Sequence, residues 1–309
     1  MVEKEEFRRT LWLLFITDRN HAWPTGSPSA IPELHFKVDL PITEDFFQSL
    51  DVNAESSPVE NIPFTRNLNR LIASVASVDD TTNVFAYICI AHVLLGQVAD
   101  LIHSVHASPK SPEYAEDCAE LDNHLTRFRL SLPRQATSIL EARSADRGHV
   151  IWLQIMSNAS AMLLHYRCSS GVPVEDANLQ FMLAMTAARN IVRVVQDASR
   201  ISIDLLMSAH IAPSLYVAAC ILIIGWRTTG DQSYKDDVDL LALVFDRMNE
   251  LYVFLGLKYK LALEHDLKRS KESVADLRHR GLRGLLADCS KWRHVKEEVE
   301  RRGIPINIT

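Results

Sequence analysis

Glycine and proline are scarce in this sequence of 309 residues, which contains 10 glycines and 12 prolines. These two residues punctuate chains built from many short strands, so their scarcity argues against an all-β fold. The chain is 47% hydrophobic and 23% charged, a balance that fills a large core and excludes a largely disordered protein. We expect an all-α protein with one large multi-helix domain over residues 1–270, followed by charged C-terminal helices and a tail over residues 271–309.

Paired cysteines are missing as well. The five cysteines lie far apart, and none of them forms a Cys-x-x-Cys motif. An odd and scattered set excludes a disulfide framework, suits a reducing compartment and lacks the spacing of zinc ligands. We expect these cysteines to behave as small apolar core residues. They are Cys89, Cys118, Cys168, Cys220 and Cys289.

The sequence has no surplus of basic residues. It carries 33 Lys and Arg against 39 Asp and Glu, which gives a net charge of −6 and a pI near 6.1. Proteins that grip nucleic acid carry a basic surface that displaces counterions from phosphate, so this chain is a poor DNA binder. The exception is a basic patch near the C-terminus, which more often indicates a solvated helix face. The patch consists of Lys268, Arg269, Lys271, Arg278, His279, Arg280 and Arg283, interleaved with Glu272 and Asp276.

No hydrophobic run is long enough to predict a membrane helix. The longest apolar stretch, residues 211–226, is interrupted by Pro213 and Ser214. It is shorter than the roughly 20 residues that a bilayer span needs, so we expect a helix buried in the protein and no membrane contact. Acidic residues also stand where a secretory signal carries basic ones, so we expect no export signal.

The apolar pattern predicts helices separated by few loops. A proline-rich extended segment is expected over residues 23–41, because proline fixes φ and disfavours helix, and a flexible acidic loop is expected near residues 51–63. One predicted helix shows a single apolar stripe at steps of three and four residues, namely Tyr114, Cys118, Leu121, Leu125, Phe128 and Leu132. The helices are expected over residues 4–20, 64–78, 82–106, 113–131, 146–169, 175–199, 203–227 and 235–270.

The first predicted helix is apolar on nearly every side, so we expect it to be buried almost all round. Glu5 lies four residues before Arg9, which favours a helical ion pair, and Arg8 can lie over the ring of Trp12. We further expect Trp12 to be tied to the loop that contains Pro24, Gly26 and Pro28. The apolar residues of this helix are Phe7, Leu11, Trp12, Leu13, Leu14, Phe15 and Ile16.

Asp18 stands where this helix is expected to end. Its carboxylate can accept hydrogen bonds from the following loop and thereby hold the loop against the helix. We therefore expect a structural role for these charges, with direct ligand contact as the alternative.

Taken in order, the residues of this region resemble a known family. The chain contains Glu5-x-x-Arg8-Arg9-x-x-Trp12, then Phe15, Asp18-Arg19, Gly26-x-Pro28 with Ile31, and Asp39-Leu40-Pro41. This series resembles the conserved segment in the middle homology region of fungal zinc-cluster transcription factors.

Later segments continue the resemblance in the same order. Leu132-Pro133 is similar to a family helix that ends in Leu-Pro, and residues 162–167, with His165 and Arg167, are similar to a helix in which apolar residues precede a His-Arg pair. Residues 181–195 and 212–224 resemble the two helices that follow. Together the similar segments cover most of residues 3–265, and their order and spacing carry the comparison.

The resemblance implies a helical regulatory domain of a nuclear transcription factor rather than an enzyme. It implies a homodimer, contacts with the transcription machinery or co-regulators, and a small-molecule effector. No catalytic residue, cofactor-binding residue or metal ligand falls on the matched positions. The family holds zinc only in a six-cysteine DNA-binding head, whose cysteine pairs this sequence lacks. Only Met1 to Glu3 precede the Arg-Arg-x-x-Trp helix, so we expect a truncated chain that reaches DNA through a missing N-terminal domain.

Two other functions stay open. Asp79-Asp80-x-x-Asn83 has the shape of the magnesium and diphosphate motif of all-helical terpene cyclases, although Asp79-Asp80 also suits the start of a helix. That chemistry needs a second motif, and the nearest candidate has Leu240 and Val244 in place of a hydroxyl and a carboxylate. The other function is a helical effector-binding scaffold with no DNA role.

A metal site is a further alternative. His92, Asp100 and His103 fall roughly on one helical face, with His106 nearby. Without a second ligand-bearing segment, hydrogen-bonded core histidines are the more common outcome. The sequence also contains no Gly-x-Ser-x-Gly elbow, phosphate-binding loop or dinucleotide fingerprint.

Overall fold

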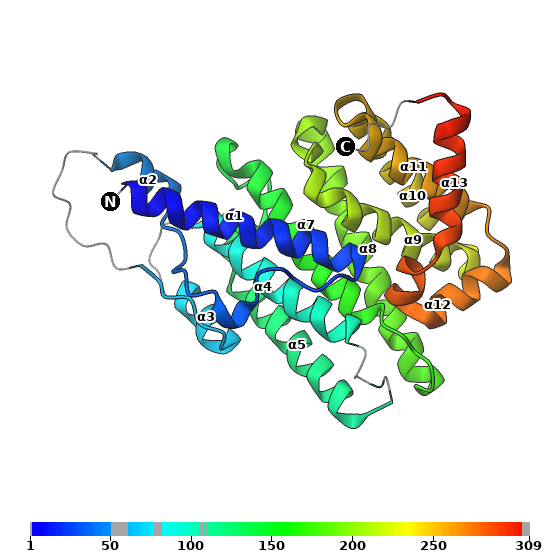
Figure 1. Cartoon of the computed structure of the whole chain (residues 1–309), viewed down its shortest axis with the longest axis horizontal. Helices are drawn as coiled ribbons and strands as arrows, with labels where there is room; N and C mark the ends of the chain where they lie inside the picture. The colour runs from blue at the N-terminus through cyan, green and yellow to red at the C-terminus, as the bar shows by residue number, and fades with distance from the viewer. Residues whose placement is uncertain (1, 51–60, 77–81, 105–107, 109, 305–309) are drawn as a thin grey trace. The chain divides into compact units, whose positions relative to one another are not determined.

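The computed structural model describes residues 2–50, 61–76, 82–104, 108 and 110–304. Within this part of the chain every regular element is helical, which confirms the all-α fold class (Figure 1). Short 3-10 turns lie at Glu33–His35, Ser144–Asp146, Ile203–Leu206 and Ala209–Ile211. The α-helices are α1 (Val2–Thr25), α2 (Glu44–Ser49), α3 (Leu68–Ala76), α4 (Val84–His103), α5 (Pro112–Ser131), α6 (Arg134–Thr137), α7 (Arg147–His165), α8 (Val174–Ile201), α9 (Ala212–Thr229), α10 (Gln232–Leu251), α11 (Val253–Leu267), α12 (Lys271–Leu286) and α13 (Cys289–Arg301).

The contacts of the chain define two compact units, and each is described by itself. The first unit comprises residues 1–101 and 117–157, and the second comprises residues 102–116 and 158–309. No feature of the sequence marks this division, because its boundaries fall inside α4, α5 and α7 rather than in linkers. The expected division between residues 1–270 and 271–309 stays a prediction, and α12 and α13 pack on helices of the second unit.

An aromatic cluster forms part of the core of the first unit. The ring of Trp12 is fully buried and packs edge-on against Phe15, Phe36 and Phe64, with ring centroids 5.4, 4.8 and 5.6 Å away. Such edge-to-face contacts stabilise an aromatic core beyond the area that they bury. The cluster holds the segment after α1 against the buried side of this helix.

Helix α1 is longer than expected. It continues past residue 20 to Thr25 and includes Pro24, although the residue before a proline disfavours helix. Trp23 is almost completely buried, so its packing outweighs that local preference. The hydroxyl of Thr25 donates to the carbonyl oxygen of His21 at 2.8 Å and thereby satisfies a backbone group at the helix end.

The expectation that α1 is buried almost all round is wrong. Its buried side carries Trp12, Phe15 and Ile16, whereas the side chains on the other side reach solvent. The packed segments cover only one side of the helix, which the composition of the helix does not reveal. The exposed apolar residues are Phe7, Leu11, Leu13 and Leu14.

Helix α9 is the buried centre of the second unit, as the apolar run over residues 211–226 predicts. It packs against α8, α10, α11 and α12, and almost all of its side chains are buried. The helix begins only at Ala212, because Pro213 suits a first turn, and 3-10 turns occupy part of the expected helical region before it.

Two helices meet the length and hydropathy of a membrane span, Val84–His103 and Ala209–Thr229. In each of them 78% of the apolar window is buried inside the protein. Core helices of a globular protein have the same length and composition, so these two helices are weak evidence for a membrane.

The single helix expected over residues 235–270 is two helices, α10 and α11, which break at Tyr252 and pack against each other. Gly256 permits this close packing. A Cβ atom at Gly256 would lie 2.3 Å from the backbone nitrogen of Asn249 and 2.5 Å from the carbonyl oxygen of Phe245. The glycine therefore marks a close helix approach rather than continuation of one helix.

The apolar stripe predicted on residues 113–131 is largely confirmed in α5. Tyr114, Cys118, Leu121, Leu125 and Phe128 are all buried. Leu132 lies one residue beyond the end of α5 and is half-buried, since the helix ends at Ser131. Two of the predicted core cysteines, Cys168 and Cys289, are not buried.

Candidate functional site

The pair Asp18 and Arg19 holds the loop that follows α1. The two carboxylate oxygens of Asp18 accept from the backbone nitrogens of Ala30 and Ile31 at 2.8 and 3.1 Å. Arg19 donates to the carbonyl oxygen of Ile31 at 2.9 Å and to Asp18 at 2.5 Å. The predicted role of Asp18 in fixing the loop is confirmed, although α1 continues for another seven residues to Thr25.

Arg19 is buried against α4. Its guanidinium carbon lies 4.1 Å from the ring centroid of Phe15, a cation–π contact. A Cβ atom at Gly96 would lie 2.6 Å from Arg19 Nε, so the glycine makes room for the arginine. Burial lowers the pKa of Arg19, and the opposing charges of Asp18, Asp100 and Glu33 offset part of that effect. These contacts indicate a structural arginine.

Glu5 is the centre of a second polar cluster on α1. Its carboxylate is 1% exposed, accepts from Arg9 Nε at 3.1 Å and also binds Arg8. The predicted pair of Glu5 and Arg9 is confirmed, and Arg8, expected over Trp12, is held by Glu5. The backbone nitrogen of Ile42 donates to Glu5 at 3.1 Å, and Arg9 donates to the carbonyl oxygen of Ile42 at the same distance.

Trp12 joins α1 to the Asp39-Leu40-Pro41 segment. Its indole nitrogen donates to the carbonyl oxygen of Asp39 at 2.8 Å. Trp12 therefore does not anchor the loop of Pro24, Gly26 and Pro28 as expected, because twelve helical residues, or about 18 Å, separate it from Pro24. Leu40 is buried, whereas Gly26 and Pro28 are exposed.

The other positions matched by the family resemblance lie elsewhere and do not join this cluster. Leu132 and Pro133 follow α5, with Pro133 at the start of α6. In the second unit, Nδ1 of His165 lies 2.8 Å from Oε1 of Gln180, and Arg167 donates to the same oxygen at 3.1 Å. His165 and Arg167 thus connect the end of α7 to α8, which is again a structural role.

The described residues of the two terpene-cyclase-like motifs have structural contacts. Asp79 and Asp80 lie outside the described residues. The side-chain oxygen of Asn83 accepts from the backbone nitrogen of Ala86 at 3.1 Å, which is the contact of a helix N-cap. Val244, which stands in place of the second motif's carboxylate, is a buried core residue.

The candidate metal ligands near His92 do not form a metal-binding group among the described residues. His92 is fully buried, its Nδ1 lies 2.8 Å from the carbonyl oxygen of Ile88, and its Nε2 lies 3.1 Å from Nδ2 of Asn20. Both ring nitrogens therefore have protein partners. His106 lies outside the described residues, and in the part of the chain with assigned positions no group of three His, Cys, Asp or Glu is arranged to hold a metal ion.

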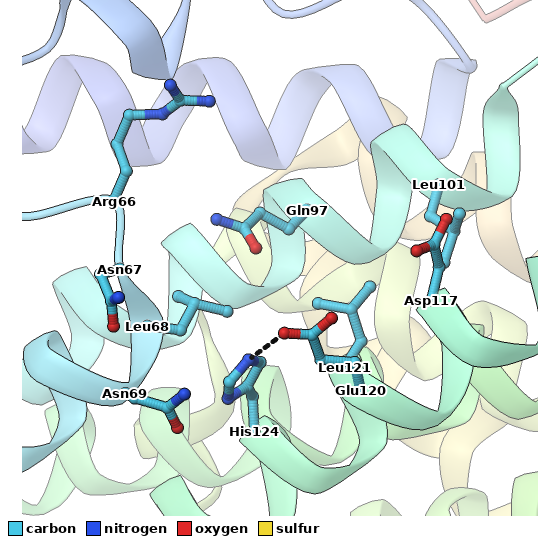
Figure 2. Close-up of a pocket in the computed structure, with 10 residues that line it drawn as sticks. All are labelled: Arg66, Asn67, Leu68, Asn69, Gln97, Leu101, Asp117, Glu120, Leu121 and His124. Atoms are coloured by element: carbon cyan, nitrogen blue, oxygen red, sulfur yellow. Dashed lines mark ion pairs between the residues drawn. The ribbon is translucent and has the colours of Figure 1, made fainter. Parts of the chain in front are cut away.

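A groove in the first unit is a candidate ligand site. It encloses about 350 Å³, within the range of small-molecule pockets, and is formed by α4, α5 and the start of α3 (Figure 2). None of its residues was singled out as a site residue from the sequence, because they come from three segments that only the fold brings together. The lining residues are Arg66, Asn67, Leu68, Asn69, Gln97, Leu101, Asp117, Glu120, Leu121 and His124.

Glu33 fixes two side chains at the rim of this groove. The amide nitrogen of Gln97 donates to both carboxylate oxygens of Glu33 at 3.0 and 3.3 Å, and Arg66 forms an ion pair with it at 3.7 Å. Burial raises the pKa of Glu33, while Gln97 and Arg66 oppose that rise. Glu33 therefore orients a lining amide and holds the lining cation near the groove.

A buried polar network lies in the second unit. The ammonium group of Lys291 donates to the hydroxyl of Tyr216 at 3.0 Å, and that hydroxyl donates to Asp266 at 2.5 Å. Arg269 donates to the other oxygen of Asp266 at 2.6 Å. Lys291 and Asp266 are 0% and 2% exposed, so this is a fully desolvated charge cluster that joins α9, α11 and α13.

The burial of this network perturbs its neighbours. Burial raises the pKa of Tyr216 well above its usual value, and the nearby Cys220 and Asp266 raise it further. Burial opposes ionisation of Asp288, but hydrogen bonds from Ser290 and Arg269 prevail and lower the pKa of Asp288 to about 2. These hydrogen bonds join three helices, so the network indicates a structural anchor of the second unit.

The basic patch near the C-terminus is partly neutralised by the fold. Arg269 binds Asp266 and Asp288, and the largest effect on its pKa is burial, which the two carboxylates outweigh so that the pKa is raised. Arg278 donates to Asn178 at 2.5 Å, and Arg280 pairs with an acidic neighbour one turn away. Fewer cations are therefore free to meet phosphate than the sequence indicates.

We predict that this chain alone does not bind DNA in a sequence-selective way. A net charge of −6 opposes the phosphate attraction that precedes recognition. The measurement is a titration of the zinc-free chain against random and candidate promoter duplexes at about 0.15 M salt. Selective binding at nanomolar concentration would contradict the prediction and imply a DNA-reading surface built from helices alone.

Comparisons with protein-family models, with curated proteins and with solved structures give no match.

Proposed function

We propose that this chain is the regulatory and interaction domain of a fungal zinc-cluster type transcription factor, acting in the nucleus. The supporting observation is that the residues of the family-like motif work as one structural unit. The backbone of residues 30–42 is hydrogen-bonded by four side chains of α1, those of Arg9, Trp12, Asp18 and Arg19. These side chains all fix the same segment against α1, which supports a structural role for the motif. We assign no catalytic group among them.

Regulation by this domain works through protein contacts. Several helices expose apolar side chains, among them α1 with Phe7, Leu11 and Leu14 at helical spacing and α8 with Leu179 and Met182. Exposed apolar groups of this kind are candidate contacts for co-regulators, the transcription machinery or a second copy of the chain. DNA contact and zinc belong to a separate head in this proposal.

The proposal does not include an enzyme. Diphosphate chemistry of the terpene-cyclase type needs polar ligands from two helices. Of the positions concerned, Asn83 serves as a helix cap and Val244 is part of the core. The scaffold alternative, an effector-binding helical protein with no DNA role, is favoured by one observation, which is the polar groove of the first unit.

A reporter assay tests the transcriptional role. The chain is fused to an unrelated DNA-binding domain and targeted to a promoter that drives a reporter gene. We expect the fusion to raise or lower reporter output several-fold relative to the DNA-binding domain alone. The matched control is the fusion with Trp12→Ala, which disrupts the motif's aromatic core and should abolish the effect.

Protein levels and nuclear localisation of the fusion are measured in parallel by immunoblotting and microscopy. An intact, nuclear fusion that leaves the reporter unchanged in both directions would contradict the proposed function.

A further inference from the structure

The groove of the first unit has opposite polarity at its two ends. In Figure 2, Arg66 and the residues that begin α3 lie at one end, and Asp117 and Glu120 of α5 lie toward the other. Most single-charge ligands need only one of these ends. The separation of positive and negative groups along one cavity is the feature that identifies a ligand class.

The α3 end is electropositive. The first turn of a helix leaves backbone N–H groups without intrahelical partners, and Leu68 and Asn69 of that turn line the groove. Arg66 is 58% exposed at its side chain, and its ion pair with Glu33 at 3.7 Å involves only Nε, so the guanidinium keeps further N–H donors for a ligand. The side-chain oxygen of Asn69 accepts from Arg127 at 2.5 Å, which leaves the amide NH₂ group as a further donor.

The α5 end is electronegative. Asp117 is exposed, and its carboxylate binds no other residue in the described part of the chain. Glu120, one turn further on, lies 3.5 Å from Nε2 of His124. The amide nitrogen of Gln97 is occupied by Glu33, so its carboxamide oxygen remains as an acceptor, and Figure 2 shows this oxygen on the side facing His124.

His124 is the independent indication that the groove takes a ligand. Its side chain is 9% exposed and lines the cavity, and its Nδ1 atom has no hydrogen-bond partner among the described residues. A buried polar atom without a partner is costly unless water or a ligand binds it. Leu68, Leu101 and Leu121 supply apolar surface beside it.

We propose that this groove binds a small zwitterion, with its carboxylate at the α3 end, its ammonium group at the α5 end and an apolar linker over the leucines. Arg66 and the first turn of α3 receive the carboxylate, while Asp117 and Glu120 receive the ammonium group. His124 contacts the ligand between them. A pure anion would face the two carboxylates of α5, and a pure cation would leave the α3 end empty.

Isothermal titration calorimetry on the full chain tests this site with four probes. The zwitterions are 4-aminobutyrate and 6-aminohexanoate, and the single-charge probes are hexanoate and hexylammonium. We expect at least one zwitterion to bind with a Kd below about 1 mM. Hexanoate and hexylammonium should bind at least about tenfold more weakly, because each lacks one charge-assisted contact.

Two variants test which residue binds the ammonium group of the ligand and which binds its carboxylate. Asp117→Asn should weaken binding of the zwitterion about tenfold, and Arg66→Gln should do the same through the carboxylate. Both residues are exposed, so the variants should keep the circular dichroism spectrum of the original chain. Glu6→Gln, which removes an exposed carboxylate from α1 outside the groove, is the matched control and should leave binding unchanged.

Three results would overturn the proposal. The first is the absence of zwitterion binding at concentrations up to about 10 mM. The second is binding of hexanoate or hexylammonium as tight as that of the zwitterions, and the third is zwitterion binding that Asp117→Asn does not change. The site stands independently of the transcriptional role, since the calorimetry uses no DNA and the reporter assay uses no added ligand.

Discussion

Replacing Trp12 by alanine is expected to lower the free energy of unfolding by about 3 to 5 kcal/mol, the range for truncating a large core aromatic residue. The side chain is 0% exposed and lies between Phe15, Phe36 and Phe64. Its removal leaves a cavity and deprives the carbonyl oxygen of Asp39 of its donor. Both losses act on the same contact between α1 and the segment that follows it.

A urea melt followed by circular dichroism measures this change, and two further variants separate its causes. Trp12→Phe keeps an aromatic ring but removes the indole N–H, so we expect a loss of about 1 to 3 kcal/mol from the unpaired carbonyl group and the smaller ring. Phe7→Ala is the matched control on the exposed side of α1, where Phe7 is 64% exposed. A Trp12→Ala loss no larger than that of Phe7→Ala would contradict the aromatic-core assignment.

Replacing Asp266 by asparagine is expected to destabilise the protein by about 3 to 5 kcal/mol, because removal of one partner leaves buried charge without compensation. Asparagine has nearly the size of aspartate, so the change creates little cavity. Lys291 would keep its contact with Tyr216 but would lose the negative charge that Asp266 places on the other side of that hydroxyl. Arg269 would keep one carboxylate partner, Asp288, and its contact with Ser273.

The matched control is Asp276→Asn in the same unit. Asp276 pairs with Arg280, but both side chains are about half exposed, so the expected loss is about 1 kcal/mol or less. The free energy of unfolding is again measured in urea. Equal small losses for the two variants would contradict an energetically important buried network.

A second substitution shows whether unpaired charge is the cause. Lys291→Met in the Asp266→Asn background removes the stranded ammonium group and replaces it by an apolar chain of similar length. We expect the double variant to recover part of the stability lost by Asp266→Asn, as buried ion pairs often tolerate joint replacement by apolar residues. Additive losses would indicate that Lys291 contributes through packing alone.

Local sequence was sufficient wherever a short segment carried its own signal. The scarcity of glycine and proline predicted the helical fold, and the long apolar run over residues 211–226 predicted the buried helix α9. The spacing of Glu5 and Arg9 predicted their ion pair, and the loop contacts expected of Asp18 are also present, although α1 ends only at Thr25. Each of these depends on residues close along the chain.

Local sequence was not sufficient where the packing partner determined the outcome. The composition of α1 predicted burial on all sides, yet only the side that meets Phe36 and Phe64 is covered. The apolar pattern over residues 235–270 did not reveal the break between α10 and α11, because helical periodicity continues on both sides of Tyr252. Trp12 was expected to meet the nearest loop, but its indole reaches a carbonyl group 27 residues away.

The sequence by itself thus determined the class of secondary structure, one buried central helix, the ion pair of Glu5 with Arg9 and the loop contacts of Asp18. Only the tertiary structure decided the polar groove and the buried network. The groove combines the start of α3 with residues of α4 and α5, and Lys291 meets Tyr216 across 75 residues of chain. The physical reason is that a charged residue in a polar segment looks solvent-exposed until the fold places a partner beside it, and no local periodicity records that partner.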